Sequence, residues 1–266
     1  MLDITDNESV AQFTQFALEL ADIGRKNAMK YFRKTLKIDN KPDRSPVTIA
    51  DREVEMKMRS LIGENYPDHG IFGEEHGQEN VDHPQLWVLD PIDGTKSFVT
   101  GMPTFGSLIS FLVAGQPTIG VLEMPALNER WLGVVGKPTL FNQDPCQTSS
   151  CKTLEQAKIY ATSIDMFSDA ERQIYYQVSS LAAIRRFGGD CYSYGLLASG
   201  HIDVVMESTL EPYDYLALVP VVQGAGGVIT DWSGKPLDLH SAGNVLASAT
   251  PELHQQVLDL IAKNGG

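Results

Sequence analysis

The amino-acid sequence predicts a layered α/β fold, and three patterns along its 266 residues support this prediction. Apolar residues recur at helical spacing in two N-terminal segments, short apolar runs between turn residues follow, and strand-like and helix-like segments alternate in the second half. We therefore expect two α/β units with a seam near residues 140–157. They would form one domain, 1–266, with subdomains of about 1–145 and 146–266.

Two long helices are expected at the start of the chain. Thr5-x-x-Glu8 has the capping-box pattern and begins an amphipathic helix that we expect to end near Leu36. Thr48-x-x-Asp51 begins a second helix, which Tyr66-Pro67 ends because the residue before a proline is driven away from helical backbone angles.

Strands separated by turn signals such as Ala114-Gly115-Gln116-Pro117 come next. The expected strands are Leu86–Leu89, Gly106–Val113, Thr118–Met124 and Arg130–Val135. Turns this short imply antiparallel pairing, because a parallel crossover needs a connection of about a dozen residues or more.

The second half alternates between strands and helices. The expected strands are Lys158–Ser163, Ile202–Glu207 and Val245–Ser248. The expected helices are Ser168–Leu181, Cys191–Ser199, Tyr213–Gly224 and a last helix that Thr250-Pro251 caps. This half is therefore predicted to form a second α/β layer.

Composition and charge narrow the class of protein. The net charge of −13 argues against nucleic acid or an anionic membrane as a partner. The 3 cysteines cannot complete a disulfide framework, and the N-terminal residues have neither the basic nor the apolar region of a secretion signal. No apolar run approaches the roughly 18 residues of a membrane span. We expect a cytoplasmic protein.

Two carboxylates lie close together just after the first expected strand. Asp90 and Asp93 flank Pro91-Ile92, and carboxylates held this close repel one another unless a cation neutralises them. A hard metal ion bound by oxygen atoms would do so. The alternative is an ordinary surface turn, since Asp, Pro and Gly are common turn residues.

Other acidic residues favour the metal interpretation if they lie near this pair. Glu74 follows an apolar pair, Asp51 lies in the first turn of the second helix, and Asp214 begins a later helix behind Glu207 and Glu211. Each alone is commonly a solvated charge or a helix N-terminal acid. The sequence does not show whether they converge.

Gly94-Thr95 adds a second property to the same loop. Glycine lets the backbone approach a ligand, the following amides can point at a phosphate, and the Thr95 hydroxyl can orient a water molecule. Acidic groups and an anion share a site only with metal between them. The combination predicts metal-assisted phosphoryl hydrolysis.

Four segments together resemble the inositol monophosphatase superfamily of magnesium-dependent, lithium-sensitive phosphatases. They are SPVTIAD at 45–51, GEEHG at 73–77, DPIDGTKSF at 90–98 and PYDYLALVPVVQGAGG at 212–227. The resemblance implies an α/β fold of five layers, an αβαβα sandwich, and assembly as a homodimer. It also implies a small phosphorylated metabolite as substrate and Mg²⁺ as cofactor.

The resemblance also implies roles for individual residues. Glu74, Asp90 and the Ile92 carbonyl would hold one Mg²⁺, and Asp90, Asp93 and Asp214 a second, with Asp51 supporting a third through water. Glu74 and Thr95 would position the attacking water, with Asp51 among the catalytic residues. The phosphate would contact Asp93, Gly94 and Thr95, and Asp214 would also line the substrate.

Within the superfamily, three segments are closer to the histidinol-phosphate phosphatase branch: NERW at 128–131, RFGGDCY at 186–192 and EPYD at 211–214. Typical inositol phosphatases have Trp in place of Tyr213 and a small residue pair in place of Asp190-Cys191. We therefore expect a histidinol-phosphatase of histidine biosynthesis. The alternatives are an inositol-1-monophosphatase or broad sugar-phosphate phosphatase, a nucleotide-bisphosphate phosphatase, and a regulator that binds metal or phosphate without catalysis.

Substrate choice is expected to depend on Asp190 and Glu207, with Glu211 as a further candidate. Histidinol phosphate carries an ammonium group, which the Asp190 carboxylate can pair with. Asp190 can instead cap the helix that follows it, and the two roles are compatible.

Overall fold

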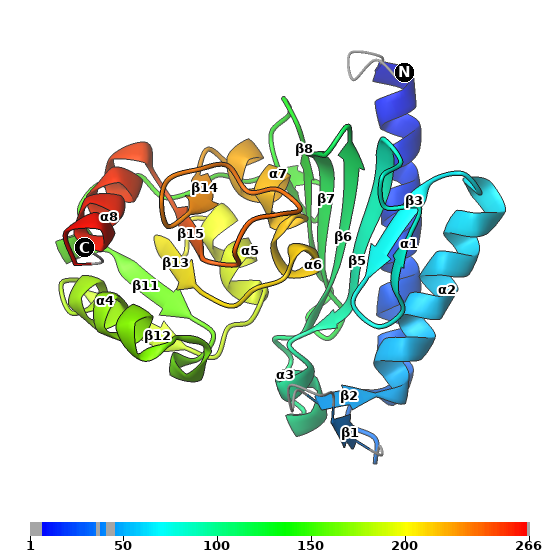
Figure 1. Cartoon of the computed structure of the whole chain (residues 1–266), viewed down its shortest axis with the longest axis horizontal. Helices are drawn as coiled ribbons and strands as arrows, with labels where there is room; N and C mark the ends of the chain where they lie inside the picture. The colour runs from blue at the N-terminus through cyan, green and yellow to red at the C-terminus, as the bar shows by residue number, and fades with distance from the viewer. Residues whose placement is uncertain (1–6, 36–37, 41–45, 265–266) are drawn as a thin grey trace.

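Two helices cover the outer face of a large sheet in the computed structural model, which describes residues 7–35, 38–40 and 46–264 (Figure 1). α1 (Asn7–Tyr31) and α2 (Ile49–Asn65) bury their apolar side chains against this sheet. The predicted cap at Thr5 lies outside the described residues. The predicted end of α1 near Leu36 is wrong, because the chain leaves the helix after Tyr31 and Arg33 has a φ of 58°.

The predicted cap of α2 is confirmed. The Ala50 amide donates a hydrogen bond to the Thr48 hydroxyl at 3.0 Å, and the Thr48 amide donates to the Asp51 carboxylate at 2.8 Å. Two short strands, β1 (Ile38–Asn40) and β2 (Pro46–Thr48), pair antiparallel before this helix.

The large sheet has the strand order β10-β9-β8-β7-β6-β5-β3-β4. Its strands are β3 (Gly70–Gly73), β4 (Gly77–Glu79), β5 (Gln85–Asp93), β6 (Gly106–Val113), β7 (Gln116–Met124), β8 (Glu129–Val134), β9 (Leu140–Phe141) and β10 (Asp144–Pro145). β5 to β8 are antiparallel neighbours in chain order, as the short turns predicted.

The pairing of β3 with β5 is parallel and was not predicted. β3 has only four residues, two of them glycine, so its sequence carries little strand signal. Its register places Gly73 opposite Leu89. Glu74, which follows β3, therefore lies beside Asp90 of β5, and this pairing brings distant acidic residues together.

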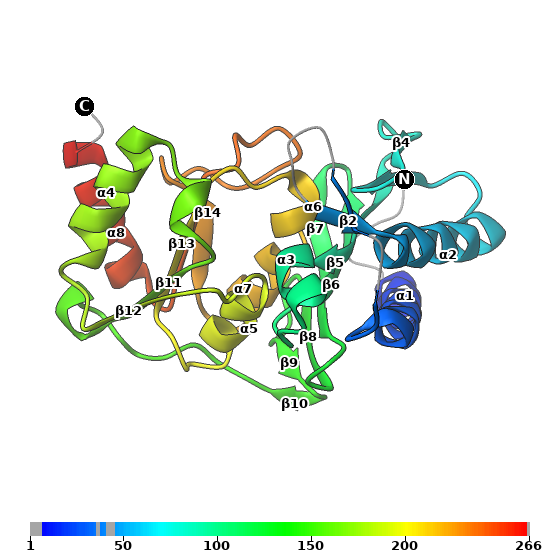
Figure 2. The ribbon, with the colours of Figure 1, turned by 90° about the horizontal axis from the view of Figure 1, so that it is seen from below.

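Three short helices form the middle layer between the two sheets (Figure 2). They are α5 (Tyr192–Ala198), α6 (Pro212–Tyr215) and α7 (Leu218–Gly224). The single helix predicted over residues 213–224 is therefore wrong. The helix is interrupted at Leu216 and Ala217, and Pro220, in the first turn of α7, has no amide hydrogen to donate to the carbonyl of Leu216.

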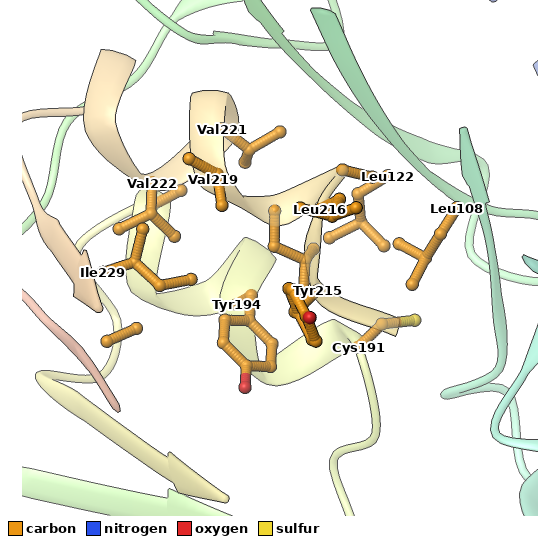
Figure 3. Packing of buried hydrophobic residues seen from close by; sticks show 14 of the residues in the cluster. Leu108, Leu122, Cys191, Tyr194, Tyr215, Leu216, Val219, Val221, Val222 and Ile229 are labelled. Carbon is orange, nitrogen blue, oxygen red and sulfur yellow. The ribbon is translucent and has the colours of Figure 1, made fainter. Parts of the chain in front are cut away.

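The middle helices pack on the large sheet through one apolar core. Side chains such as Tyr194, Leu216 and Val221 share this core with Leu108 and Leu122 of the large sheet (Figure 3). Burial of this kind contributes about 25 cal/mol per Å² of apolar surface, so the middle layer joins the two halves of the molecule firmly.

The second sheet has the strand order β12-β11-β13-β15-β14 and is covered on its outer face by α4 (Asp169–Ser179) and α8 (Pro251–Asn264) (Figure 1). Its strands are β11 (Lys158–Ala161), β12 (Ile184–Phe187), β13 (Val204–Glu207), β14 (Val228–Asp231) and β15 (Val245–Ser248). The remaining helices are α3 (Thr95–Thr100), η1 (Leu154–Gln156) and η2 (Ile164–Met166).

The layers therefore follow the order helix, sheet, helix, sheet, helix, which confirms the five-layer αβαβα sandwich. The division into subdomains 1–145 and 146–266 stays a prediction. Among the described residues, no helix is both long and apolar enough to cross a lipid bilayer.

Candidate active site

The acidic residues of the first half meet where β3 and β5 end. Because the two strands are parallel and in register, Glu74 follows β3 beside Asp90, and the Glu74 amide donates to the Leu89 carbonyl at 3.2 Å. The pair Asp90 and Asp93 is not a simple surface turn. Both residues belong to β5, and an irregularity in its pairing with β6 lies between them.

The second half contributes a third aspartate to the same place. Asp214 lies in the first turn of α6, where the Glu211 amide donates to its carboxylate at 2.8 Å. One carboxylate oxygen from each of Asp90, Asp93 and Asp214 lies within 4.8 Å of the other two. The structure thus brings Asp214 to the pair Asp90 and Asp93, from which it is more than 120 residues distant in the sequence.

Burial and mutual repulsion raise the pKa values of these aspartates. Burial raises the pKa of Asp90 well above its ordinary range, and the charges of Glu74, Asp93 and Asp214 raise it further. Burial, followed by the charge of Asp93, does the same to Asp214. The pKa of Asp93 rises to about 7 through burial and the charge of Asp190, although the Cys191 amide donates to its carboxylate at 2.8 Å.

This donor set fits a hard divalent cation. All its side-chain ligands are carboxylate oxygens, which Mg²⁺ prefers, and a bound cation would relieve the repulsion that raises their pKa values. The main chain of Ile92 lies in the same loop: its amide donates to Asp90 at 3.0 Å, and its carbonyl accepts from the Thr95 hydroxyl at 3.2 Å.

Asp51 joins this loop from α2. Its carboxylate is fully buried and accepts hydrogen bonds from the Thr48 hydroxyl at 2.7 Å and from the Thr95 hydroxyl at 3.3 Å. The capping-box aspartate of α2, Asp51, therefore also holds Thr95, the threonine expected to orient water. Asp51 thus has two roles: it completes the capping box of α2, and it lies in the candidate active site.

Gly94 has a left-handed backbone with a φ of 77° at the start of α3. A Cβ atom at this position would lie 2.9 Å from Cγ of Asp190. The glycine therefore both forms the turn and leaves space for the Asp190 side chain.

Replacing Gly94 by alanine is expected to destabilise the fold by about 1–2 kcal/mol, because left-handed angles strain an L-residue. The change also pushes Asp190 away from the loop. Urea unfolding followed by circular dichroism measures this. Gly63→Ala is the matched control, since that helical glycine has nothing within 4 Å of an added Cβ, and it should be neutral or stabilising. Equal stability of Gly94→Ala and wild type would contradict the expectation.

Asp190 and Glu207 line a cavity of about 100 Å³ beside the aspartate cluster. Both Ser97 and Thr104 donate to the Asp190 carboxylate, at 2.5 and 3.2 Å. α5 begins beyond this residue without any side-chain cap, so the capping role considered for Asp190 is wrong. Asp190 has a φ of 45°, and burial raises its pKa.

Glu207 lies at the end of β13 on another wall of this cavity. The Thr162 amide donates to its carboxylate at 2.8 Å and the Tyr194 hydroxyl at 2.9 Å. Burial raises the pKa of Glu207. The cavity therefore combines two aspartates of the candidate metal site, Asp93 and Asp214, with two further carboxylates and a few apolar side chains.

Sequence reasoning missed Glu55, which is fully buried on α2. It lies one helical turn after Asp51, on the face that also carries Val54 and Met58, so a charged residue within an apolar face was the available signal. His69, just before β3, is half-buried. Its ring accepts a hydrogen bond from the Trp87 indole at 3.1 Å, and burial lowers its pKa to about 4.

Comparisons with known proteins identify the family of this chain. Residues 9–265 match the model of the inositol monophosphatase family. The chloroplastic bifunctional phosphatase IMPL2 of Arabidopsis thaliana is 45% identical over 268 residues, which cover 97% of this chain and 77% of the plant protein. A histidinol-phosphatase of Chlorobaculum parvum is 35% identical over 238 residues, covering 88% of this chain and 91% of that protein.

A solved structure gives the same result for the fold. An inositol monophosphatase from Zymomonas mobilis shares 40% sequence identity and superposes with a TM-score of 0.87, covering 95% of this chain and 98% of that chain.

Proposed function

Since this chain belongs to the inositol monophosphatase family of phosphatases, we propose that it is a magnesium-dependent phosphate monoester hydrolase that acts on histidinol phosphate. The observation that carries the proposal is the placement of Asp190 and Glu207 in the cavity beside Asp90, Asp93 and Asp214. The aspartates suit a phosphate with its metal, and the further carboxylates suit a cationic group on the same small molecule.

Glu74, Asp90, Asp93, Asp214 and the Ile92 carbonyl are the groups proposed to hold the metal. When bound there, Mg²⁺ supplies positive charge that offsets the negative charge developing on the phosphoryl oxygens. The charge of the protein alone would repel a phosphate from this cluster.

Side chains near Thr95 are proposed to position the attacking water and to accept its proton. The Thr95 hydroxyl can donate to Asp51, which leaves its oxygen lone pairs able to accept a hydrogen bond from a water molecule. Glu74 is proposed to accept the proton of that water as its oxygen attacks phosphorus and the bond to the leaving oxygen breaks. Asp51 keeps the threonine in place through its own bonds to Thr48.

Two observations bear on the choice of substrate. A histidinol-phosphatase is among the relatives, and the carboxylate of Asp190 faces the cavity, where an ammonium group would pair with it. Inositol 1-phosphate is the second candidate. It is supported by the Zymomonas mobilis inositol monophosphatase and by carboxylate acceptors that can bind hydroxyl groups.

Phosphate release from a panel of substrates tests the proposal. The panel holds histidinol phosphate, inositol 1-phosphate and a 3′-phosphoadenosine nucleotide, each with and without Mg²⁺. We expect the fastest turnover with histidinol phosphate, and none without the metal. Turnover of inositol 1-phosphate alone would overturn the assignment of histidinol phosphate as substrate. No turnover of any compound would favour a regulator that binds metal or phosphate without catalysis.

Asp190→Asn tests the substrate assignment directly. Loss of a charge-assisted hydrogen bond should raise KM for histidinol phosphate about tenfold or more, while KM for inositol 1-phosphate changes little. Steady-state kinetics with both substrates measure this. Asp82→Asn, an exposed residue, is the control and should change neither value. Equal losses for both substrates would exclude Asp190 as the ammonium partner.

Assembly as a homodimer and a cytoplasmic location stay predictions. The plant relative is named as a chloroplastic protein. Sedimentation of the purified protein tests the dimer.

A further inference from the structure

We propose that Glu55 is a positioning residue whose buried carboxylate fixes the turn that carries Glu74, and thereby sets the affinity of the site for its metal ion. The inference rests on the proposed function, in which Glu74 is a metal ligand. Glu55 lies on α2, is fully buried, and is not among the groups proposed to contact metal or substrate.

Both oxygens of Glu55 bind the main chain of that turn. Oε2 accepts a hydrogen bond from the Glu75 amide at 2.7 Å, and Oε1 accepts one from the His76 amide at 3.1 Å. Nε of Arg59, one helical turn further along α2, donates to Oε1 at 2.7 Å. A buried carboxylate is tolerated only when it is paired and hydrogen-bonded, and these three donors provide that.

Arg59 holds the other side of the same turn. Its guanidinium also donates to the Gly77 carbonyl and lies 3.7 Å from the Glu79 carboxylate. The Glu55 carboxylate therefore accepts hydrogen bonds from amides of the turn, and Arg59 donates one to a carbonyl of the same turn. Together the two side chains hold the segment between β3 and β4 through both its donors and its acceptors.

The turn itself is shaped to receive Glu55. A Cβ atom at Gly73 would lie 2.1 Å from Oε1 of Glu55, so only glycine leaves room for the carboxylate. Gly73 is also the residue paired with Leu89 on β5. Glu74 thus lies between Gly73, which contacts Glu55, and Glu75, whose amide donates a hydrogen bond to Glu55.

The same face of α2 fixes both halves of the candidate metal site. Asp51 accepts from Thr95 in the loop after β5, and Glu55, four residues later, holds the turn after β3. One rigid helix therefore sets the separation of Glu74 from the aspartate loop. Without Glu55 the turn would need to be ordered when metal binds, and that ordering entropy would weaken binding.

Glu55→Gln is the decisive variant, because glutamine keeps the shape but loses the charge and one of the two acceptors. Calorimetric titration of the metal-free protein with Mg²⁺ should show affinity weakened about tenfold, which corresponds to one lost charge-assisted hydrogen bond. At saturating Mg²⁺, kcat should stay within about twofold of wild type, since the residue touches no reacting atom. Glu64→Gln, exposed on the same helix, is the matched control and should bind Mg²⁺ as wild type does.

Hydrogen exchange gives a second measurement that needs neither metal nor substrate. In the metal-free Glu55→Gln protein, the amides of Glu75 and His76 should exchange about tenfold faster, while those in the interior of β5 are unchanged. If Glu55→Gln does not fold, Arg59→Lys serves the same test. Lysine cannot reach both Glu55 and Gly77, so weaker Mg²⁺ binding is again expected.

The outcomes separate this inference from the proposed function. Wild-type Mg²⁺ affinity and wild-type amide exchange in the variant would overturn the role of Glu55. So would a loss confined to kcat. If the wild-type protein binds Mg²⁺ but releases phosphate from no substrate, the proposed function fails while the role of Glu55 in metal binding is still measured.

Discussion

Asp90→Asn is expected to reduce the rate of phosphate release on the order of 10³-fold. The change removes a ligand shared by both proposed metal positions, and the transition state thereby loses several kcal/mol of electrostatic stabilisation. The same change should stabilise the metal-free protein. Asp90 is buried next to Glu74, Asp93 and Asp214, and their charges raise its pKa, so removing its charge relieves repulsion in the folded state. Activity and stability should therefore change in opposite directions.

Two measurements on one preparation check this expectation. Phosphate release at saturating Mg²⁺ gives the activity, and thermal unfolding in a chelator gives Tm. Asp144→Asn, an exposed residue on β10, is the control and should change neither. Wild-type activity of Asp90→Asn would contradict the assignment of Asp90 as a metal ligand. A lower Tm of the metal-free variant would contradict the claim that the buried charge of Asp90 destabilises the metal-free protein.

Stabilisation by Mg²⁺ is expected to be large above neutral pH and small in acid. Burial raises the pKa of Asp93 from its ordinary value of 3.8 to about 7. A carboxyl group with a raised pKa contributes stability below its unfolded pKa and loses it as pH rises through its folded pKa. From this group the metal-free protein should therefore lose stability as pH rises from about 3.8 to about 7, so it should be less stable at about pH 8 than at about pH 5.5. Bound Mg²⁺ removes the loss, because it binds the ionised form.

Thermal unfolding with and without Mg²⁺ at both pH values measures the effect. At about pH 8, Mg²⁺ at roughly 100 times its Kd should stabilise the protein by about 2.7 kcal/mol, or several degrees in Tm. At about pH 5.5 the shift should be much smaller, because a proton must leave Asp93 before metal binds. Asp90→Asn, which lacks the ligand shared by both proposed metal positions, serves as the control. An equal shift at both pH values would contradict the raised pKa of Asp93 or its role as a ligand.

Local sequence was sufficient for the elements that have strong local signals. The capping box at Thr48, the amphipathic pattern of α2 and the tight turns between β5 and β8 each depend on neighbouring residues, so the pattern predicted them. Elements with weak local signals were missed. β3 contains two glycines, and all residues of the edge strand β12 are exposed, so neither has the alternation that marks a strand.

The candidate site divides in the same way. Asp90, Asp93, Gly94 and Thr95 lie within six consecutive residues, so the sequence alone determined that carboxylates, a glycine and a hydroxyl share one short segment. Their resemblance to a family motif gave the chemistry. The sequence did not distinguish the two roles of Asp190, because capping and ligand binding both use an aspartate at a helix start.

The sequence by itself therefore determined which functional groups this protein offers and which short segments carry them. Only the tertiary structure decided that they meet. The parallel pairing of β3 with β5 places Glu74 beside Asp90, α6 brings Asp214 across from the second half, and α2 turns Glu55 onto the Glu74 turn. These contacts join residues far apart in the chain, and they depend on strand register and layer packing, which no local pattern of residues specifies.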